Sequence, residues 1–185
     1  MSANRYGAPA IVLHWLVAAL VLLTIPLGIY MADLPLSPQK LKLYSYHKWI
    51  GVTVFGLAVV RVLWRLTHAA PPLDPALPAW QRKAAHAVHG LLYVLILAIP
   101  LSGWIYSSAV GVPTVYLGLW QLPDLVTRDR ELADSLKAVH MTLAYGLAAL
   151  VLVHLLAALK HHFIDRDGVL ARMVPFIRSR SGVRA

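Results

Sequence analysis

The longest stretches without a charged residue set the strongest limit on how this chain can fold. Residues 6–32 contain no Asp, Glu, Lys or Arg over 27 positions, residues 84–123 contain none over 40, and residues 138–159 contain none over 22. A helix of about 20 apolar residues crosses the hydrocarbon core of a bilayer. A soluble domain of 185 residues that is 59% hydrophobic would leave much of that surface in water. The sequence therefore predicts an integral membrane protein.

Four spans are predicted, at about residues 10–30, 47–66, 86–107 and 138–160. The first run contains Pro26 and continues without a small-residue cleavage site, which favours an uncleaved helix over a signal peptide. The second is the weakest because Arg61 interrupts it and must snorkel or find a partner. The rest of the 84–123 run, rich in Gly and Pro, is expected to lie on or dip into the membrane surface. We expect one all-α domain over residues 1–185, a four-helix transmembrane bundle with a basic tail at 161–185.

The distribution of Lys and Arg predicts the orientation of this bundle. Four spans place both termini on one side, which holds eleven of the 17 basic residues, against six on the other. The positive-inside rule then makes both termini cytoplasmic. The net charge of +9 is explained by cytoplasmic loops and a tail that anionic lipids attract, so no nucleic acid is expected as a partner.

The absence of cysteine restricts the chemistry. Disulfides, Cys-ligated iron-sulfur clusters, thiol nucleophiles and covalently attached c-type haem all need cysteine, and the chain has none. Any redox centre must therefore use other ligands, and histidine is the obvious candidate.

Four histidines lie within or at the edge of the predicted spans. His140 and His154 are 14 residues apart, which puts them on one face of a helix and about 21 Å apart along its axis. His47 is expected at the depth of His140, and His14 at the depth of His154. Two sites, each with two imidazoles from facing helices, fit two six-coordinate b haems. The alternative is that these histidines form hydrogen bonds between helices.

Other polar residues are weaker candidates for cofactor binding. His86 and His89 share a helix face and could replace His14 as a ligand, lie near a haem propionate or a quinone head group, or form interfacial hydrogen bonds. Arg61, 14 residues after His47, is a candidate partner for a propionate. Lys48 and Lys137 border the opposite site in the same way. The roles of His161 and His162, just beyond the last span, stay open.

Several stretches of the chain resemble the bacterial cytochrome b561 family, whose bundle is related to the cytochrome b subunits of hydrogenases and formate dehydrogenases. The matching segments cover nearly the whole chain and begin at Ile11, Tyr46, Val60, Ala85, Ser135, His161 and Asp167. The resemblance implies one haem b bound by His14 and His154 and another bound by His47 and His140. It also implies a bacterial inner membrane protein.

The expected function is transmembrane electron transfer between a periplasmic small-molecule donor and membrane quinone. The family resemblance implies a quinone-linked oxidoreductase, with superoxide as the donor to test and ubiquinone as its electron partner. An alternative is a cytochrome b anchor and relay subunit of a hydrogenase or dehydrogenase complex, and a third is a metal or proton transporter. Expected partners are lipids, quinone, and a second copy or a redox subunit.

Overall fold

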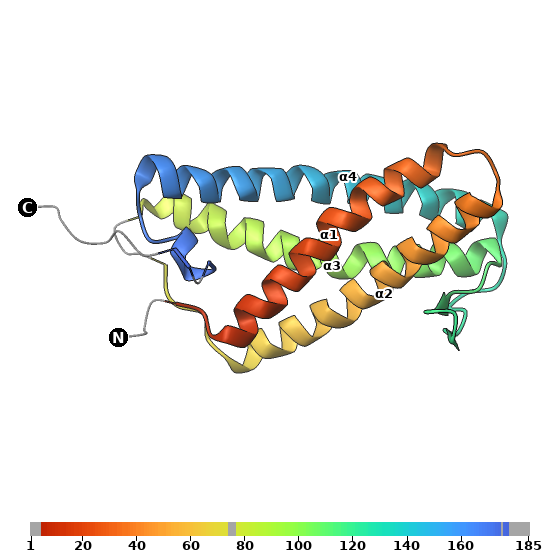
Figure 1. The fold of residues 1–185 in the computed structure, drawn as a ribbon, viewed down its shortest axis with the longest axis horizontal. Helices are drawn as coiled ribbons and strands as arrows, with labels where there is room; N and C mark the ends of the chain where they lie inside the picture. The colour runs from red at the N-terminus through yellow and green to blue at the C-terminus, as the bar shows by residue number, and fades with distance from the viewer. Residues whose placement is uncertain (1–4, 74–76, 175, 178–185) are drawn as a thin grey trace, which may run out of the picture.

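Four long helices dominate the computed structural model, which describes residues 5–73, 77–174 and 176–177 (Figure 1). They are α1 (Ala8–Asp33), α2 (Pro38–Thr67), α3 (Ala79–Val110) and α4 (Arg130–Lys160). Each is long and apolar enough to cross a membrane. This confirms the predicted fold class, an all-α four-helix transmembrane bundle.

The helices pack in chain order. α1 lies against α2, α2 against α3, and α3 against α4, and Figure 1 shows α3 and α4 running side by side while α1 crosses obliquely. A small apolar core joins them, and its buried members are Val17, Val21, Val54, Ala58, Leu95, Ile96 and Leu147. Many of the other large apolar side chains of the helices are exposed. That is the pattern expected of a bundle whose surroundings are lipid rather than water.

Neither internal proline ends its helix. Pro26 lies inside α1 and Pro100 inside α3, and both helices continue through these positions. Proline removes one backbone hydrogen bond, a loss that neighbouring helices compensate in transmembrane segments. Discontinuous helices, the feature that would favour a transporter, are therefore not found at these two positions.

A short hairpin interrupts the connection between α3 and α4. Strands β1 (Val115–Tyr116) and β2 (Trp120–Gln121) pair antiparallel, with Tyr116 opposite Trp120. The sequence predicted a surface loop here but no strands. The hairpin is fixed to α2, because Trp49 Nε1 donates to the carbonyl of Val115 at 2.7 Å and Thr53 Oγ1 lies 2.9 Å from Tyr116 Oη. We call this end of the bundle the hairpin end.

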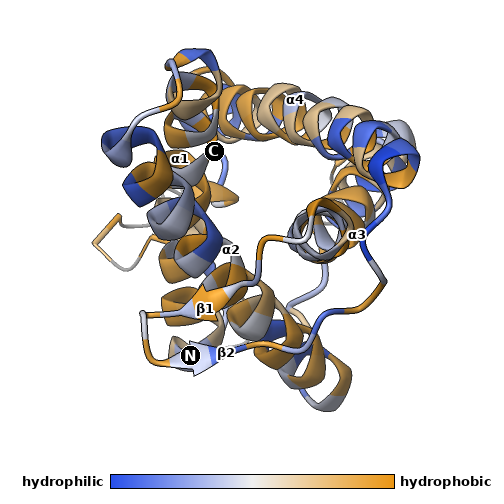
Figure 2. Ribbon diagram, turned by 90° about the vertical axis from the view of Figure 1, so that its right-hand side faces the viewer, coloured by the Kyte–Doolittle hydropathy of each residue, from blue (hydrophilic) through white to orange (hydrophobic). Residues whose placement is uncertain are grey.

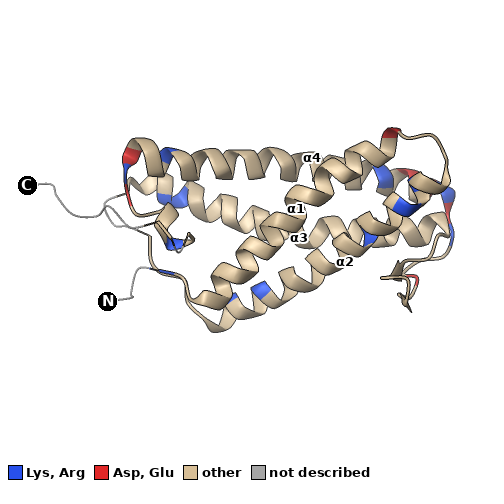
Figure 3. Ribbon diagram, viewed as in Figure 1, with Lys and Arg blue, Asp and Glu red and all other residues tan. Residues whose placement is uncertain are grey.

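The opposite end, here the terminal end, is closed by the C-terminal segment. After α4 come a π-helical turn, η1 (His161–Asp165), and a 3-10 turn, η2 (Leu170–Arg172). Trp15 Nε1 donates to the carbonyl of Met173 at 2.8 Å, and Arg172 donates to the carbonyl of Pro72 at 2.7 Å. Charged residues gather at the two ends (Figure 3). Residues 178–185 of the predicted tail lie outside the described residues.

Candidate functional site

Two pairs of histidine rings face each other across the bundle. His14 of α1 and His154 of α4 have ring centroids 6.4 Å apart with an interplanar angle of 74°. His47 of α2 and His140 of α4 have centroids 6.2 Å apart at 78°. The four histidines singled out in the sequence thus meet in the two expected combinations, one near each end of α4.

The separation of the rings suits two imidazoles that share a metal. A bond from metal to imidazole nitrogen is about 2 Å and the nitrogen lies roughly 1 Å from its ring centroid, so two such rings have centroids about 6 Å apart. Within the described part of the chain, the hydrogen bonds of His14, His47 and His140 all involve Nδ1. In this part of the chain their Nε2 atoms make no hydrogen bond, and the residues fit a haem bound by two histidines.

A spacing of 14 residues recurs on all four helices. On α4 it separates His140 from His154, and an α-helix brings such residues to nearly the same face about 21 Å apart. The same spacing separates His14 from Gly28 on α1, His47 from Arg61 on α2, and His89 from Gly103 on α3. Each helix thus contributes one residue to each site. The hairpin site comprises Gly28, His47, Gly103 and His140, and the terminal site comprises His14, Arg61, His89 and His154.

Glycine lies behind both histidine rings of the hairpin site. A Cβ atom built on Gly28 would lie 3.0 Å from Cε1 of His47, and one built on Gly103 would lie 3.0 Å from Cε1 of His140. Such contacts are closer than carbon atoms normally approach without strain. Because α1 and α3 carry glycine at these positions, the ring of His47 can pack against the backbone of α1 and the ring of His140 against the backbone of α3.

Polar groups orient the same two rings. Thr24 Oγ1 lies 3.2 Å from Nδ1 of His47. Nδ1 of His140 lies 3.0 Å from Ser102 Oγ and 3.1 Å from the carbonyl oxygen of Ile99. A carbonyl only accepts, so Nδ1 of His140 carries the ring proton, and Nε2 keeps the lone pair that a metal needs. This backbone contact is a typical partner of a metal-bound histidine.

The terminal site is built from larger and charged side chains. Arg61 Nη1 lies 3.0 Å from Nδ1 of His14, and Arg61 Nε donates to Tyr93 Oη at 3.1 Å. A guanidinium only donates, so Nδ1 of His14 accepts and the ring proton resides on Nε2. Ligation through Nε2 requires this hydrogen bond to break. The sequence suggested a propionate or snorkelling for Arg61, and its contact with His14 was not foreseen.

The two histidines at the start of α3 differ in their placement. The ring of His89 lies 5.4 Å from that of His154, at 71°, so this third histidine belongs to the terminal site. His86, one turn earlier on the same helix, is exposed as His89 is, and among the described residues only His89 of these two has a ring contact with His154. Of the two candidates, His89 is therefore the one that contacts a predicted ligand.

The two lysines considered for the hairpin site point elsewhere. Lys48 Nζ lies 3.3 Å from the carbonyl oxygen of Val112 and 3.5 Å from that of Pro113, in the segment that leads into the hairpin. Lys137 is exposed, one turn before His140 on α4. In the described ranges neither lysine hydrogen-bonds a histidine of either pair.

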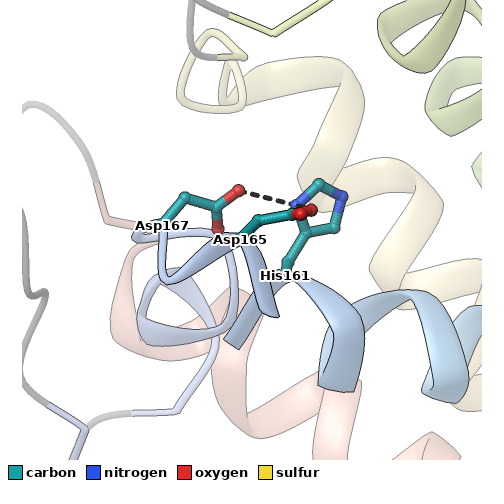
Figure 4. A group of neighbouring side chains, drawn as sticks. All are labelled: His161, Asp165 and Asp167. Atoms are coloured by element: carbon teal, nitrogen blue, oxygen red, sulfur yellow. Dashed lines mark hydrogen bonds and ion pairs between the residues drawn. The ribbon is translucent and has the colours of Figure 1, made fainter. Parts of the chain in front are cut away.

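A separate polar cluster closes the end of α4 (Figure 4). Nδ1 of His161 donates to Asp167 at 2.6 Å and lies 3.2 Å from a carboxylate oxygen of Asp165. Lys160 forms an ion pair with Asp165 at 2.6 Å, and Asp167 also accepts from the backbone of Val169 at 3.0 Å. The side chains of His161, Asp165 and Asp167 lie close enough together to surround a cation, but each carboxylate already has local partners. We interpret the cluster as a cap of the helix end. His162 contacts the ring of Phe163 instead.

Sequence reasoning missed several residues that contact the histidine pairs or Arg61. Thr24, Gly28, Ser102, Gly103 and Tyr93 all lie in apolar helices where they carry no conspicuous motif. The usable signal was the 14-residue spacing. Applied to His14 and His89 as well as to the histidines of α2 and α4, it points directly to Gly28 and Gly103.

Comparison with known proteins gives a separate line of evidence. Residues 5–176 match the family model described as prokaryotic cytochrome b561. The chain is 37% identical over 181 residues to cytochrome b561 homolog 2 of Escherichia coli (strain K12), covering 97% of this chain and 96% of the relative. Homolog 1 from the same strain is 32% identical over 173 residues, covering 93% and 98%. A probable superoxide oxidase, CybB, of Yersinia pestis is 31% identical over 179 residues, covering 93% and 97%.

Proposed function

The chain belongs to the prokaryotic cytochrome b561 family of membrane electron-transfer proteins, and on that premise we propose that it carries electrons across the membrane through two b haems. His14 and His154 hold one haem, and His47 and His140 hold the other. The observation that carries the proposal is the repeated geometry of the two pairs, with centroid separations of 6.4 and 6.2 Å at opposite ends of one helix.

Helix α4 is the structural link between the two sites. It supplies one ligand to each, and their spacing of 14 residues corresponds to about 21 Å along the axis. A b haem with two histidine ligands supplies a one-electron carrier with no open position for oxygen. The chain itself fixes the rings, excludes water with its apolar core and tunes the potential through neighbouring charges and hydrogen bonds. Electrons then move along α4 from one end of the bundle to the other.

For the substrates, we propose superoxide as donor and ubiquinone as acceptor. The relative from Yersinia pestis that is named as a probable superoxide oxidase is similar along 93% of this chain, which supports superoxide as the first donor to test. The remaining inference concerns orientation: both termini face the cytoplasm of a bacterial inner membrane, because more Lys and Arg lie at the terminal end.

Reconstitution tests this function. The purified chain is placed in vesicles that contain ubiquinone, superoxide is generated enzymatically in the outer solution, and quinol formation is followed by absorbance. The proposal predicts quinol formation that depends on the protein, is abolished by superoxide dismutase and is lost in His140→Ala. An active isolated chain also counts against the alternative role as an anchor of a larger dehydrogenase. Haem reduction by superoxide without any quinol would overturn the choice of acceptor.

A further inference from the structure

The turn of the β1–β2 hairpin exposes an unusual amount of apolar surface. Leu117 is 52% exposed, Leu119 88% and Trp120 76%. Residues 112–123 contain no charged side chain. Figure 2 views this end and shows the hairpin at one side, in front of α2, with β1 coloured as hydrophobic and β2 paler. Single exposed apolar residues are ordinary, but a contiguous apolar tip marks a contact surface.

The backbone conformation of the turn is unfavourable for Leu117, so the needs of folding alone do not explain a leucine at this position. The backbone N–H of Leu119 donates to the carbonyl of Tyr116 at 3.0 Å, and the two residues between them have positive φ, 54° at Leu117 and 73° at Gly118. Turns with two positive φ values favour Asn-Gly, because leucine tolerates the left-handed region poorly. An apolar side chain is thus kept at an exposed position where the backbone disfavours it, which indicates a role for the side chain.

The attachment of the hairpin places this tip at the edge of the hydrocarbon region. Its hydrogen-bond partners on α2 are Trp49 and Thr53, which lie in the first two turns of the uncharged run from 49 to 60. Lys48, the last charged residue before that run, holds the segment just before β1. The hairpin therefore lies where a spanning helix passes from head groups into acyl chains.

We propose that the hairpin tip, formed by Leu117, Leu119 and Trp120, inserts into the lipid interface beside α2. Two apolar side chains and an indole are the chemistry that partitions into the boundary between head groups and acyl chains. Leu117 lines one hollow together with Ile50 and Thr53 of α2, so the tip adjoins a helix that is long and apolar enough to cross the bilayer. This anchor goes beyond the proposed electron transfer and does not depend on it.

Site-specific fluorescence tests the insertion, and the absence of cysteine from the chain makes labelling clean. Leu119→Cys is labelled with an environment-sensitive dye, and the holoprotein is placed in phosphatidylethanolamine–phosphatidylglycerol vesicles that contain a nitroxide phospholipid. Thr127→Cys, exposed in the same connection, is the matched control. Insertion predicts blue-shifted emission and loss of most intensity to the nitroxide lipid at position 119 but not at 127.

A second variant and a dilution series separate lipid insertion from burial of the tip against protein. Leu117→Asn suits the turn and keeps the hairpin folded, but it removes one apolar group, so the nitroxide quenching at position 119 should fall while haem content stays constant. Emission at 119 that remains typical of water overturns the proposal. Shielding at 119 that disappears when the protein is diluted in lipid also overturns it, because a second copy rather than the bilayer would then cover the tip.

Discussion

The hairpin site and the terminal site use the same helical framework with different residues. In the hairpin site, His47 and His140 seat against Gly28 and Gly103, and neutral oxygens meet their Nδ1 atoms. The terminal site has the same spacings, yet its corresponding positions on α2 and α3 are filled by Arg61 and His89. One site is shaped by the space that glycine leaves, and the other by a charge and a third imidazole.

This difference indicates that the two sites are not equivalent in binding or in potential. The proton of His140 already lies on Nδ1, so this ligand of the hairpin site needs no change of tautomer to bind through Nε2. In the terminal site the contact between Arg61 and His14 must break before Nε2 can ligate. A nearby cation also favours the reduced form of a redox centre, so we expect the terminal site to have the higher potential. Electrons would then move downhill toward the terminal end.

The largest effect should come from filling the space behind His140. Gly103→Ala puts a methyl group 3.0 Å from Cε1 of His140, so the ring must shift by a few tenths of an ångström. We expect loss of about one of two haems per chain, because overpacking of a fixed site costs roughly 1–3 kcal/mol and displaces the ligand. Pyridine haemochrome analysis measures this. Gly90→Ala on the same helix, where an added Cβ meets nothing within 4 Å, is the control. Equal haem contents in both variants would refute the role of glycine.

The charge of Arg61 should produce the next largest effect, and only at the terminal site. Arg61→Gln removes a positive charge next to His14. At about 8 Å and an effective dielectric of 20, this interaction is on the order of 2 kcal/mol, or about 90 mV for a one-electron couple. We predict that the higher of the two midpoint potentials, measured by redox titration, is about 50–100 mV lower in Arg61→Gln than in the unmodified protein. Arg65→Gln, an exposed residue one turn later, should shift it much less. A shift in the lower potential instead would reverse our assignment of the two sites.

A smaller change is expected from the hydroxyl at the hairpin site. Ser102→Ala removes one of two acceptors around Nδ1 of His140 and leaves the carbonyl of Ile99. A hydrogen bond of this kind contributes about 1 kcal/mol, so the lower midpoint potential should change by roughly 40 mV. Both haems should remain bound. Ser135→Ala, an exposed residue of α4, provides the control. No change in the lower potential would mean that the carbonyl alone orients His140.

The smallest effect is predicted for His89, despite its position beside His154. If His14 is the ligand, His89→Ala keeps both haems and alters only the packing around His154. His86→Ala, an exposed residue of the same helix, is its matched control. Haem content and low-spin spectra report the result. Loss of one haem in His89→Ala, together with retention of both in His14→Ala, would transfer the ligand role to His89.

The parts that could be predicted from sequence are those that helical periodicity determines. Long apolar runs, one of them interrupted by Arg61, predict four spanning helices, and a fixed rotation per residue places His140 and His154 on one face of α4. The contact between Arg61 and His14 depends instead on how two helices are rotated against each other. Glycine has no side chain to reveal its role, so Gly28 and Gly103 become informative only beside a ring. The sequence did not predict the hairpin because its turn has Leu117 before Gly118, where the usual hairpin signal is Asn-Gly.

A haem count per chain for the purified protein and its histidine variants shows whether two paired histidine sites lie along α4. A reduced-minus-oxidised spectrum with pyridine haemochrome quantification should give two b haems in the unmodified chain. One haem should be lost in each of four variants, His14→Ala, His47→Ala, His140→Ala and His154→Ala. The haem with the higher potential should be lost in the variants of His14 and His154. The haem with the lower potential should be lost in the variants of His47 and His140. A single haem in the unmodified protein, or a folded protein without haem, would contradict the account of two paired sites along α4.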